Sequence, residues 1–178
     1  MKKYILDFHV VENRHLHELY SLLILRPVEG SLPDILPGQF VQVSIDNSKT
    51  TFLRRPISIN FVDRTNNNLW LLVRKAGDGT RALCDKKEGE IVNLILPLGN
   101  AFSIPPQGAS VLLVGGGVGV APMLFWGAEL NRLGFRPEFL LGARSAKDVL
   151  QRQGLCVHRR RLTRRDRTHH CQQCVVAA

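Results

Sequence analysis

The sequence of 178 residues predicts an N-terminal antiparallel β-barrel followed by an incomplete α/β domain. Two observations predict this fold class. The first hundred residues contain short runs of β-branched and large apolar residues with turn-forming residues between them. After Pro105 and Pro106 the pattern changes to an apolar run, a glycine cluster and a helical segment, which is typical of a βαβ unit. We therefore expect a barrel over residues 1–104 and a partial α/β domain over residues 107–150.

The predicted barrel strands are residues 20–25, 39–45, 57–62, 69–74 and 91–96. Turn signals separate them: Pro37 with Gly38, Asp46 with Asn47, the asparagines 66–68, and Gly99 with Asn100. Short strands at this spacing favour a small closed barrel, because closure leaves no exposed sheet edge. An open sandwich is the alternative.

The second part begins with an apolar run at residues 110–114, as expected of a parallel strand that is buried on both faces. A helix is predicted over residues 121–133, with Pro122 near its first turn and Gly134 after its end. A second strand over residues 137–142 completes the unit. The uncharged run 111–128 contains five glycines and a proline, so a strand, a turn and a helix explain it better than a membrane span.

Composition and charge describe an ordinary globular protein with an unusual tail. Hydrophobic residues make up 44% of the chain and charged residues 22%, which argues against a disordered or fibrous protein. Of the net charge of +9, residues 151–178 carry +6. Three of the four cysteines also lie there, and Cys84 stands alone in the body, so no disulfide framework is indicated. The N-terminus lacks the apolar core of a signal peptide, and we expect a cytoplasmic protein.

Residues 54–58, with the sequence Arg-Arg-Pro-Ile-Ser, are suited to holding a flavin. The arginines offer planar forks of donors for phosphate oxygens or a ring carbonyl, the proline stiffens the chain, and the serine adds a hydroxyl. An exposed arginine pair at a strand end is the alternative.

Two glycine-containing turns are further candidates for binding. Backbone donors around Gly79, together with Thr80, could face phosphate oxygens, although Asp78 and Gly79 also form an ordinary turn signal. Residues 115–119, Gly-Gly-Gly-Val-Gly, join a strand to a helix and would let a diphosphate or a nicotinamide approach the backbone closely. A tight structural turn is the alternative there, since the cluster is not a G-x-G-x-x-G motif.

The order of these motifs resembles the ferredoxin reductase-like flavoproteins, and most closely the electron-transfer subunits of type B dihydroorotate dehydrogenases. The resemblance rests on R-R-P-I-S, V-R-K-A-G-D-G-T, L-P-L-G-N and L-L-V-G-G-G-V-G-V-A-P, and it covers residues 1 to about 150. It implies an FAD-binding barrel and an incomplete Rossmann-like nucleotide-binding domain. The FAD-binding residues that it implies are Arg55, Pro56, Ile57 and Ser58, with Leu72, Val73 and Arg74 lining the same site and Gly79 and Thr80 at the diphosphate. On the NAD(H) side it implies Gly115, Gly116, Gly117, Gly119 and Pro122.

The resemblance also implies a function. In that family NADH reduces FAD, and electrons leave through a [2Fe–2S] cluster to a catalytic dihydroorotate dehydrogenase subunit of pyrimidine biosynthesis. Because the cofactors carry the chemistry, we expect no catalytic side chain. The alternatives are another ferredoxin reductase-like NAD(P)H oxidoreductase subunit, and a basic module that binds nucleic acid through its arginine-rich tail.

The chain departs from the family pattern after Leu150. The four-cysteine segment that ligates the cluster has no counterpart in this sequence, and residues 151–178 are expected to be an aberrant, irregular tail. Cys171 and Cys174, with His169 and His170 beside them, have the spacing of a zinc half-site but no second pair, so we expect no metal site. The tail has no aromatic residue to stack a base, which argues against specific binding of nucleic acid. A shift of reading frame would explain the clustered arginines and cysteines together.

Overall fold

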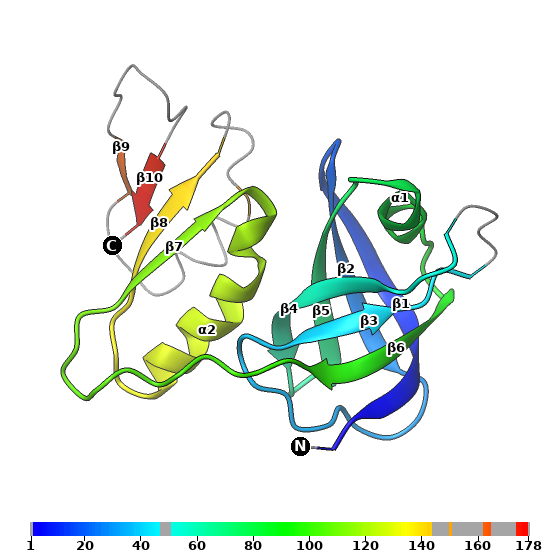
Figure 1. Ribbon diagram of the computed structural model, residues 1–178, viewed down its shortest axis with the longest axis horizontal. Coiled ribbons are helices and arrows are strands. Elements are labelled where there is room, and N and C mark those ends of the chain that lie inside the picture. The colour runs from blue at the N-terminus through cyan, green and yellow to red at the C-terminus, as the bar shows by residue number, and fades with distance from the viewer. Residues whose placement is uncertain (1, 47–50, 144–149, 151–161, 165–173, 178) are drawn as a thin grey trace. The chain divides into compact units, whose positions relative to one another are not determined.

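The computed structural model describes residues 2–46, 51–143, 150, 162–164 and 174–177 (Figure 1). The chain divides into two compact units, Met1–Phe102 and Ser103–Ala178. Each unit has its own sheet.

The first unit is a closed barrel of six antiparallel strands. Around the barrel the order is β1-β2-β5-β4-β3-β6, and β6 pairs with β1 to close it. The strands are β1 (Tyr4–His17), β2 (Tyr20–Pro27), β3 (Phe40–Val43), β4 (Arg55–Asp63), β5 (Asn68–Arg74) and β6 (Ile91–Leu98). The predicted barrel is therefore confirmed, and the open sandwich is wrong.

The first strand is not predicted by the sequence patterns. β1 buries Phe8 and Val10, but most of its other residues are exposed or half-buried. Its pairing with β2 also shifts register between Val10 and Glu12 and again between His15 and His17, which interrupts the two-residue alternation. Even so, β1 pairs with both β2 and β6, so without it the barrel would have two open edges.

The barrel interior is filled by apolar side chains from several strands. Those with no more than 1% exposure include Phe8, Leu25, Leu69, Leu71, Leu94 and Leu96. Burying each such side chain contributes about 1.5–3 kcal/mol of transfer free energy, so this core provides much of the stability of the unit.

A single short helix interrupts the strand order of the barrel. α1 (Asp78–Cys84) follows β5 directly and lies across the end of the barrel where β5 ends and β2 begins (Figure 1). Its Leu83 and Cys84 are buried. The glycine-containing segment that the sequence suggests as a turn thus begins a short helix.

The second unit contains the predicted βαβ unit. β7 (Leu112–Gly116) and β8 (Glu138–Gly142) are parallel neighbours, joined through the 3-10 turn η1 (Gly117–Val120) and the helix α2 (Ala121–Arg132). Helix and sheet touch closely, since a Cβ on Gly127 would lie 2.5 Å from the Cζ atom of Phe139. The fold class predicted from the sequence is thus confirmed.

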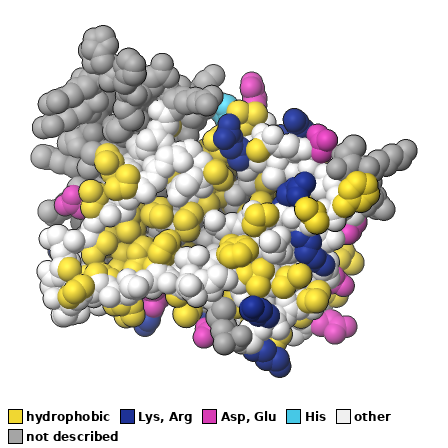
Figure 2. Space-filling view, in the orientation of Figure 1, with side chains coloured by type: hydrophobic (Ala, Val, Ile, Leu, Met, Phe, Trp, Pro, Cys, Tyr) yellow, Lys and Arg dark blue, Asp and Glu magenta, His cyan; other side chains and the backbone are white. Residues whose placement is uncertain are grey.

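One expectation about β7 is wrong. An apolar strand buried on both faces was predicted, yet Leu112 is 55% exposed and Val114 is 59% exposed, while Leu113 between them is buried. The alternation arises because α2 packs on one face of the sheet only. Figure 2 shows hydrophobic side chains gathered over α2 and β7.

The tail was expected to lack regular structure, and the structure differs in two places. β9 (Leu162–Arg164) and β10 (Cys174–Ala177) extend the second sheet in the order β7-β8-β10-β9, both pairings being antiparallel. The other tail residues lie outside the described part of the chain. Within the residues described, no helix combines the length and apolar character that crossing a membrane requires.

The substitution Leu71→Ala should lower the free energy of unfolding of the barrel by about 2–5 kcal/mol, because it leaves a cavity at a fully buried position. Denaturant unfolding followed by the fluorescence of the neighbouring Trp70, with Trp126 replaced by Phe, measures this change. The control is Ile5→Ala, since Ile5 is 66% exposed, and it should change stability by no more than about 0.5 kcal/mol. Equal effects of the two substitutions would contradict the assigned core.

Candidate functional site

The predicted flavin-binding residues 55–58 form the first half of β4. They pair with β3 along one side, from Val43 opposite Arg55 to Phe40 opposite Ser58. Strand alternation buries Ile57 in the barrel and leaves Pro56 and Ser58 exposed, with Arg55 half-buried. Proline can stand in this strand because its missing N–H is not needed on a side without a partner. The segment therefore presents one arginine and one hydroxyl outside the core.

The ladder between β4 and β5 stops beside this segment. Its last pair is Ile59 opposite Leu71, and the register runs from there only toward the hairpin at Asp63 and Asn68. Residues 72–74 of β5 pair with β2 on their other side. A seam without β4–β5 pairs therefore lies between residues 55–58 and residues 72–74. Both stretches contain predicted FAD-binding residues. Backbone groups at such a seam are available to a ligand.

The three β5 residues do not contribute in the same way. The side chains of Leu72 and Val73 are 1% and 0% exposed and belong to the barrel core. Only their backbone can face a ligand. Arg74, by contrast, is exposed.

The start of α1 is in direct contact with Arg55. A Cβ added to Gly79 would lie 2.8 Å from the Nε atom of Arg55 and 3.0 Å from the Cγ2 atom of Thr51. A side chain at this position would displace the guanidinium group of Arg55 from the place it has here. The structure therefore brings together two predicted site residues that are far apart in the sequence.

The hydroxyl of Thr80 has a different role from the one expected. It accepts hydrogen bonds from the backbone N–H groups of Ala76 (2.9 Å) and Gly77 (3.0 Å) and lies 3.0 Å from the carbonyl oxygen of Gly77. These contacts stabilise the loop before α1. What Gly79 and Thr80 can offer an anion is their backbone N–H groups, which precede the first intrahelical bond, from Arg81 to Gly77.

Arg54 is a structural residue. Its guanidinium group donates to the carbonyl oxygen of Asn93 (3.0 Å), to the Oδ1 atom of Asn93 (2.6 Å) and to the carbonyl oxygen of Gln42 (3.3 Å). Asn93 in turn donates to Asp7 (2.6 Å). These bonds join the start of β4 to β3, β6 and β1, and so hold the neighbouring Arg55 in place. No sequence motif points to Asn93 or Asp7.

The buried thiol of Cys84 lies close to the same site. Its Sγ atom is 3.8 Å from the carbonyl oxygen of Val73, and burial raises the pKa of the thiol above its ordinary value. The protonated thiol is a weak donor to that carbonyl and not a nucleophile.

The glycine cluster of the second unit forms a tight turn. A Cβ on Gly115 would lie 3.1 Å from the Cα atom of Val120, and Gly117 has a φ of +54°, which favours glycine. Gly116 and Gly119 are exposed, and no atom lies within 4 Å of a Cβ placed on Gly119. Pro122 stands in the first turn of α2. Close packing thus explains Gly115 and the positive φ explains Gly117, while Gly119 has open space beside it.

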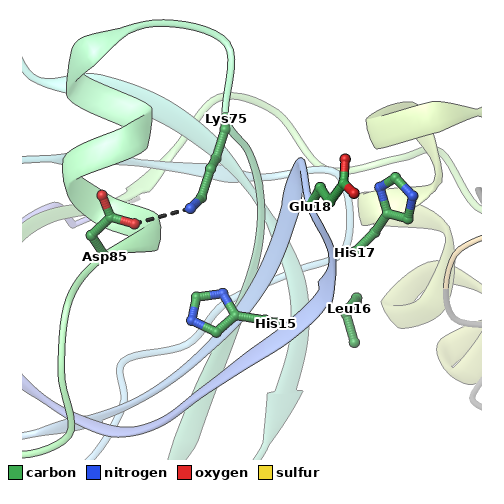
Figure 3. A pocket seen from close by; sticks show the side chains of 6 residues that line it. All are labelled: His15, Leu16, His17, Glu18, Lys75 and Asp85. Carbon is green, nitrogen blue, oxygen red and sulfur yellow. Dashed lines mark hydrogen bonds and ion pairs between the residues drawn. The ribbon is translucent and has the colours of Figure 1, made fainter.

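A hollow of about 430 Å³ lies beside α1 in the first unit (Figure 3). It is lined by His15, Leu16, His17, Glu18, Lys75 and Asp85. Lys75 forms an ion pair with Asp85 (3.0 Å), and the Nδ1 atom of His15 shares a hydrogen bond with the hydroxyl of Ser21 (2.9 Å). Among the described residues no group of three His, Cys, Asp or Glu side chains could hold a metal ion. The half-site residues His169, His170 and Cys171 lie outside the described part.

Comparison with known proteins identifies relatives by sequence. No model of a protein family matches the chain. The chain is 36% identical over 139 residues to the dihydroorotate dehydrogenase B (NAD(+)) electron transfer subunit of Lysinibacillus sphaericus, covering 77% of this chain and 51% of that protein. It is 40% identical over 127 residues to the subunit of the same name from Desulforamulus reducens, covering 69% and 48%. The chain thus spans about half the length of these relatives, and the resemblance inferred from the motifs is confirmed.

Solved structures show the same fold. The NADH-dependent reduced ferredoxin–NADP oxidoreductase matches with a TM-score of 0.70 and 26% identity, over 81% of this chain and 51% of that one. Phthalate dioxygenase reductase matches with a TM-score of 0.64 and 25% identity, over 78% and 43%. The FAD/NAD binding domain of nitric oxide dioxygenase from Vibrio cholerae has a TM-score of 0.71 at 23% identity, over 83% and 67%. The barrel and α/β arrangement is therefore that of ferredoxin reductase-like proteins.

Replacing Arg54 with alanine should lower the free energy of unfolding of the barrel by about 1–3 kcal/mol, because it removes charge-assisted hydrogen bonds that join the start of β4 to β3 and β6. Denaturant unfolding measures the change. The matched control is Arg14→Ala, which removes only an exposed pair with Glu12 and should cost no more than about 1 kcal/mol. A loss for Arg54→Ala no larger than that of the control would contradict the structural role.

Proposed function

We propose that this chain is the FAD-holding part of an electron-transfer subunit of a type B dihydroorotate dehydrogenase, with NADH as the electron donor. The observation that carries the proposal is the meeting of residues 55–58, residues 72–74 and Gly79 at the one seam of the barrel where the β4–β5 ladder has stopped. Sequence similarity to subunits of that name supports the same conclusion.

The residues at the seam fit FAD chemically. Arg55 offers a half-buried cation and Ser58 an exposed hydroxyl, while residues 72–74 offer backbone groups next to a buried apolar core. The backbone N–H groups of Gly79 and Thr80 could receive the negative charge of a diphosphate, where a Cβ on Gly79 would not fit. Bound FAD would supply the chemistry, taking up a hydride from NADH and giving up electrons singly. The chain itself would bind and orient the flavin and shield it from water.

The nucleotide side of the proposal rests on the second unit. We assign NADH to the exposed Gly116 and Gly119 and to the first turn of α2 at Pro122, on the basis of the resemblance. Gly115 and Gly117 shape the turn that presents them. The FAD-binding domain would comprise residues 1–104, and the partial domain that binds NADH would comprise residues 107–150.

The proposed partner is a catalytic dihydroorotate dehydrogenase subunit, since the relatives are named as its electron transfer subunits. We propose a cytoplasmic setting for this assembly. No cysteine set among the described residues fits the [2Fe–2S] cluster expected from the resemblance, and no cluster ligand is assigned to them.

A second candidate is a reductase that serves another acceptor, because the solved structures of similar fold include a phthalate dioxygenase reductase. The two candidates share the FAD site and differ in the protein that takes the electrons. A mixing experiment with a dihydroorotate dehydrogenase catalytic subunit distinguishes them. The comparisons do not favour the nucleic-acid alternative.

The purified chain should take up FAD on reconstitution and retain it through gel filtration as a yellow protein. Anaerobic addition of NADH should then bleach the flavin absorbance of the complex. A visible spectrum before and after each addition measures both steps. A preparation that stays colourless with excess FAD would rule out the proposal, whereas FAD uptake without bleaching would contradict only its NADH half.

Arg55→Ala should weaken FAD binding about ten-fold or more, because a charge-assisted hydrogen bond to a ligand is worth about 1.5–3 kcal/mol. Gly79→Ala should have a comparable effect, since its Cβ would displace the Arg55 guanidinium group. Titration followed by flavin fluorescence gives the dissociation constants. The matched control is Gly77→Ala: Gly77 has φ −154° and no atom within 4 Å of an added Cβ, so FAD affinity should be unchanged.

A further inference from the structure

We propose that Asn13 is a positioning residue of the FAD site: it fixes α1 and, through Gly79, sets the position of the Arg55 side chain. The inference rests on the proposed function, because that proposal identifies the region around Arg55 as an FAD site. Asn13 lies on β1, far from residues 55–58 and 72–80 in the sequence, and no motif pointed to it.

The first observation is a pair of short hydrogen bonds at the end of α1. The Nδ2 group of Asn13 donates to the carbonyl oxygen of Cys84 (2.8 Å) and to that of Lys86 (2.6 Å). The carbonyl oxygen of Cys84 is one of the last of the helix and has no partner within it, so this bond satisfies a free acceptor. The carbonyl oxygen of Lys86 lies two residues beyond the helix, so the second bond holds the chain that leaves it. One amide group thus ties β1 to the helix end across more than seventy residues of sequence.

The second observation is the orientation of the amide. Both groups that face it are carbonyl oxygens, so only the NH₂ end of Asn13 can make these bonds. Its Oδ1 atom is buried and has no hydrogen-bond partner among the described residues. A buried acceptor without a partner is unfavourable, so the stabilising contribution of this amide comes from its two donated hydrogen bonds and not from its oxygen.

The short length of α1 makes an external tie necessary. The helix has seven residues, too few to be stable without contacts to the rest of the fold. Besides Asn13, the contacts that hold its C-terminal end are the buried Leu83 and Cys84 and the ion pair between Asp85 and Lys75 (Figure 3). Lys75 is 24% exposed and Asp85 is 66% exposed, so that pair contributes little. The amide of Asn13 is the strongest polar tie at this end of the helix.

The other end of α1 touches the site. Gly79 packs against the Nε atom of Arg55 so closely that an added Cβ would lie 2.8 Å away. A shift of α1 by a few tenths of an ångström would therefore move the guanidinium group or open a gap beneath it. The contacts that connect Asn13 to Arg55 therefore pass through α1 and Gly79, and all of them lie within the first unit.

The test compares Asn13→Asp and Asn13→Ala in the full chain reconstituted with FAD. Aspartate keeps the shape of the side chain and replaces its donors by a carboxylate that faces two carbonyl oxygens. Both variants should weaken FAD binding about ten-fold or more, as expected when hydrogen bonds that fix a binding group are lost. If packing alone mattered, Asn13→Asp would bind FAD like the wild type, and the proposal would be overturned. If the Asn13→Asp variant does not fold, FAD binding by Asn13→Ala provides the test.

A double-mutant cycle with Arg55→Ala separates positioning from general destabilisation. If Asn13 acts through Arg55, its substitution should change FAD affinity by less than about two-fold in the Arg55→Ala background. An undiminished loss there would overturn the proposal. The matched control is Asn68→Ala, which removes the bond from Arg26 (3.1 Å) at the opposite end of β5 and should leave FAD affinity unchanged.

A measurement without flavin distinguishes this inference from the proposed function. In a ¹H–¹⁵N spectrum of the free protein, the Nε–H signal of Arg55 should shift in Asn13→Asp and stay in place in Asn68→Ala. An unchanged signal in Asn13→Asp would overturn the positioning role, whether or not FAD binds. A shifted signal in a protein that takes up no FAD would support the positioning role and contradict the proposed function.

Discussion

The early end of the β4–β5 ladder is the constraint on which the site depends. A closed barrel satisfies its backbone groups by pairing every strand with two neighbours, yet β4 and β5 pair only from Ile59 and Leu71 toward their hairpin. Beyond that point the two strands retain their other neighbours, β3 and β2, so the barrel stays closed by packing and pairing elsewhere. The seam provides backbone groups at a fixed place on a rigid scaffold. Arg55 and α1 are both arranged around it.

The two adjacent arginines, Arg54 and Arg55, have different surroundings in this scaffold. Strand geometry sends successive side chains to different surroundings. Arg54 turns to Asn93 and Gln42, where its donors join strands, whereas Arg55 turns to Gly79. An arginine whose donors are already used inside the fold is poorly placed to bind a ligand. The motif therefore contains one structural residue and one residue that is proposed to bind FAD, although both have the same side chain.

Sequence patterns predicted the elements that are apolar and evenly spaced, and failed where the pattern is broken. Five of the six barrel strands were predicted as apolar runs, but the polar residues and register shifts of β1 hide its alternation. The segment around Gly79 was singled out for its glycines and threonine, but Gly79 lies in α1, and its contact with Arg55 exists only after folding. The hydroxyl of Thr80 bonds the loop before α1, and the role of Thr80 at a diphosphate stays a prediction. Asn13 could not be predicted, since its partners are carbonyl groups from the other end of the barrel sequence.

The two glycine-rich segments now support the function to different degrees. Gly79 lies so close to Arg55 that an added Cβ would displace the guanidinium group, and both residues belong to the proposed FAD site, so the close contact and the proposed site coincide. Glycine at position 115 is required by the backbone of Val120, and at position 117 by a positive φ, and both requirements would hold in a turn that binds nothing. Gly119 differs from these two glycines, because the space where its Cβ would stand is open and the turn does not require a glycine there for packing. The flavin half of the proposal is therefore supported by the geometry of the chain and by its relatives, whereas the nucleotide half is supported mainly by its relatives.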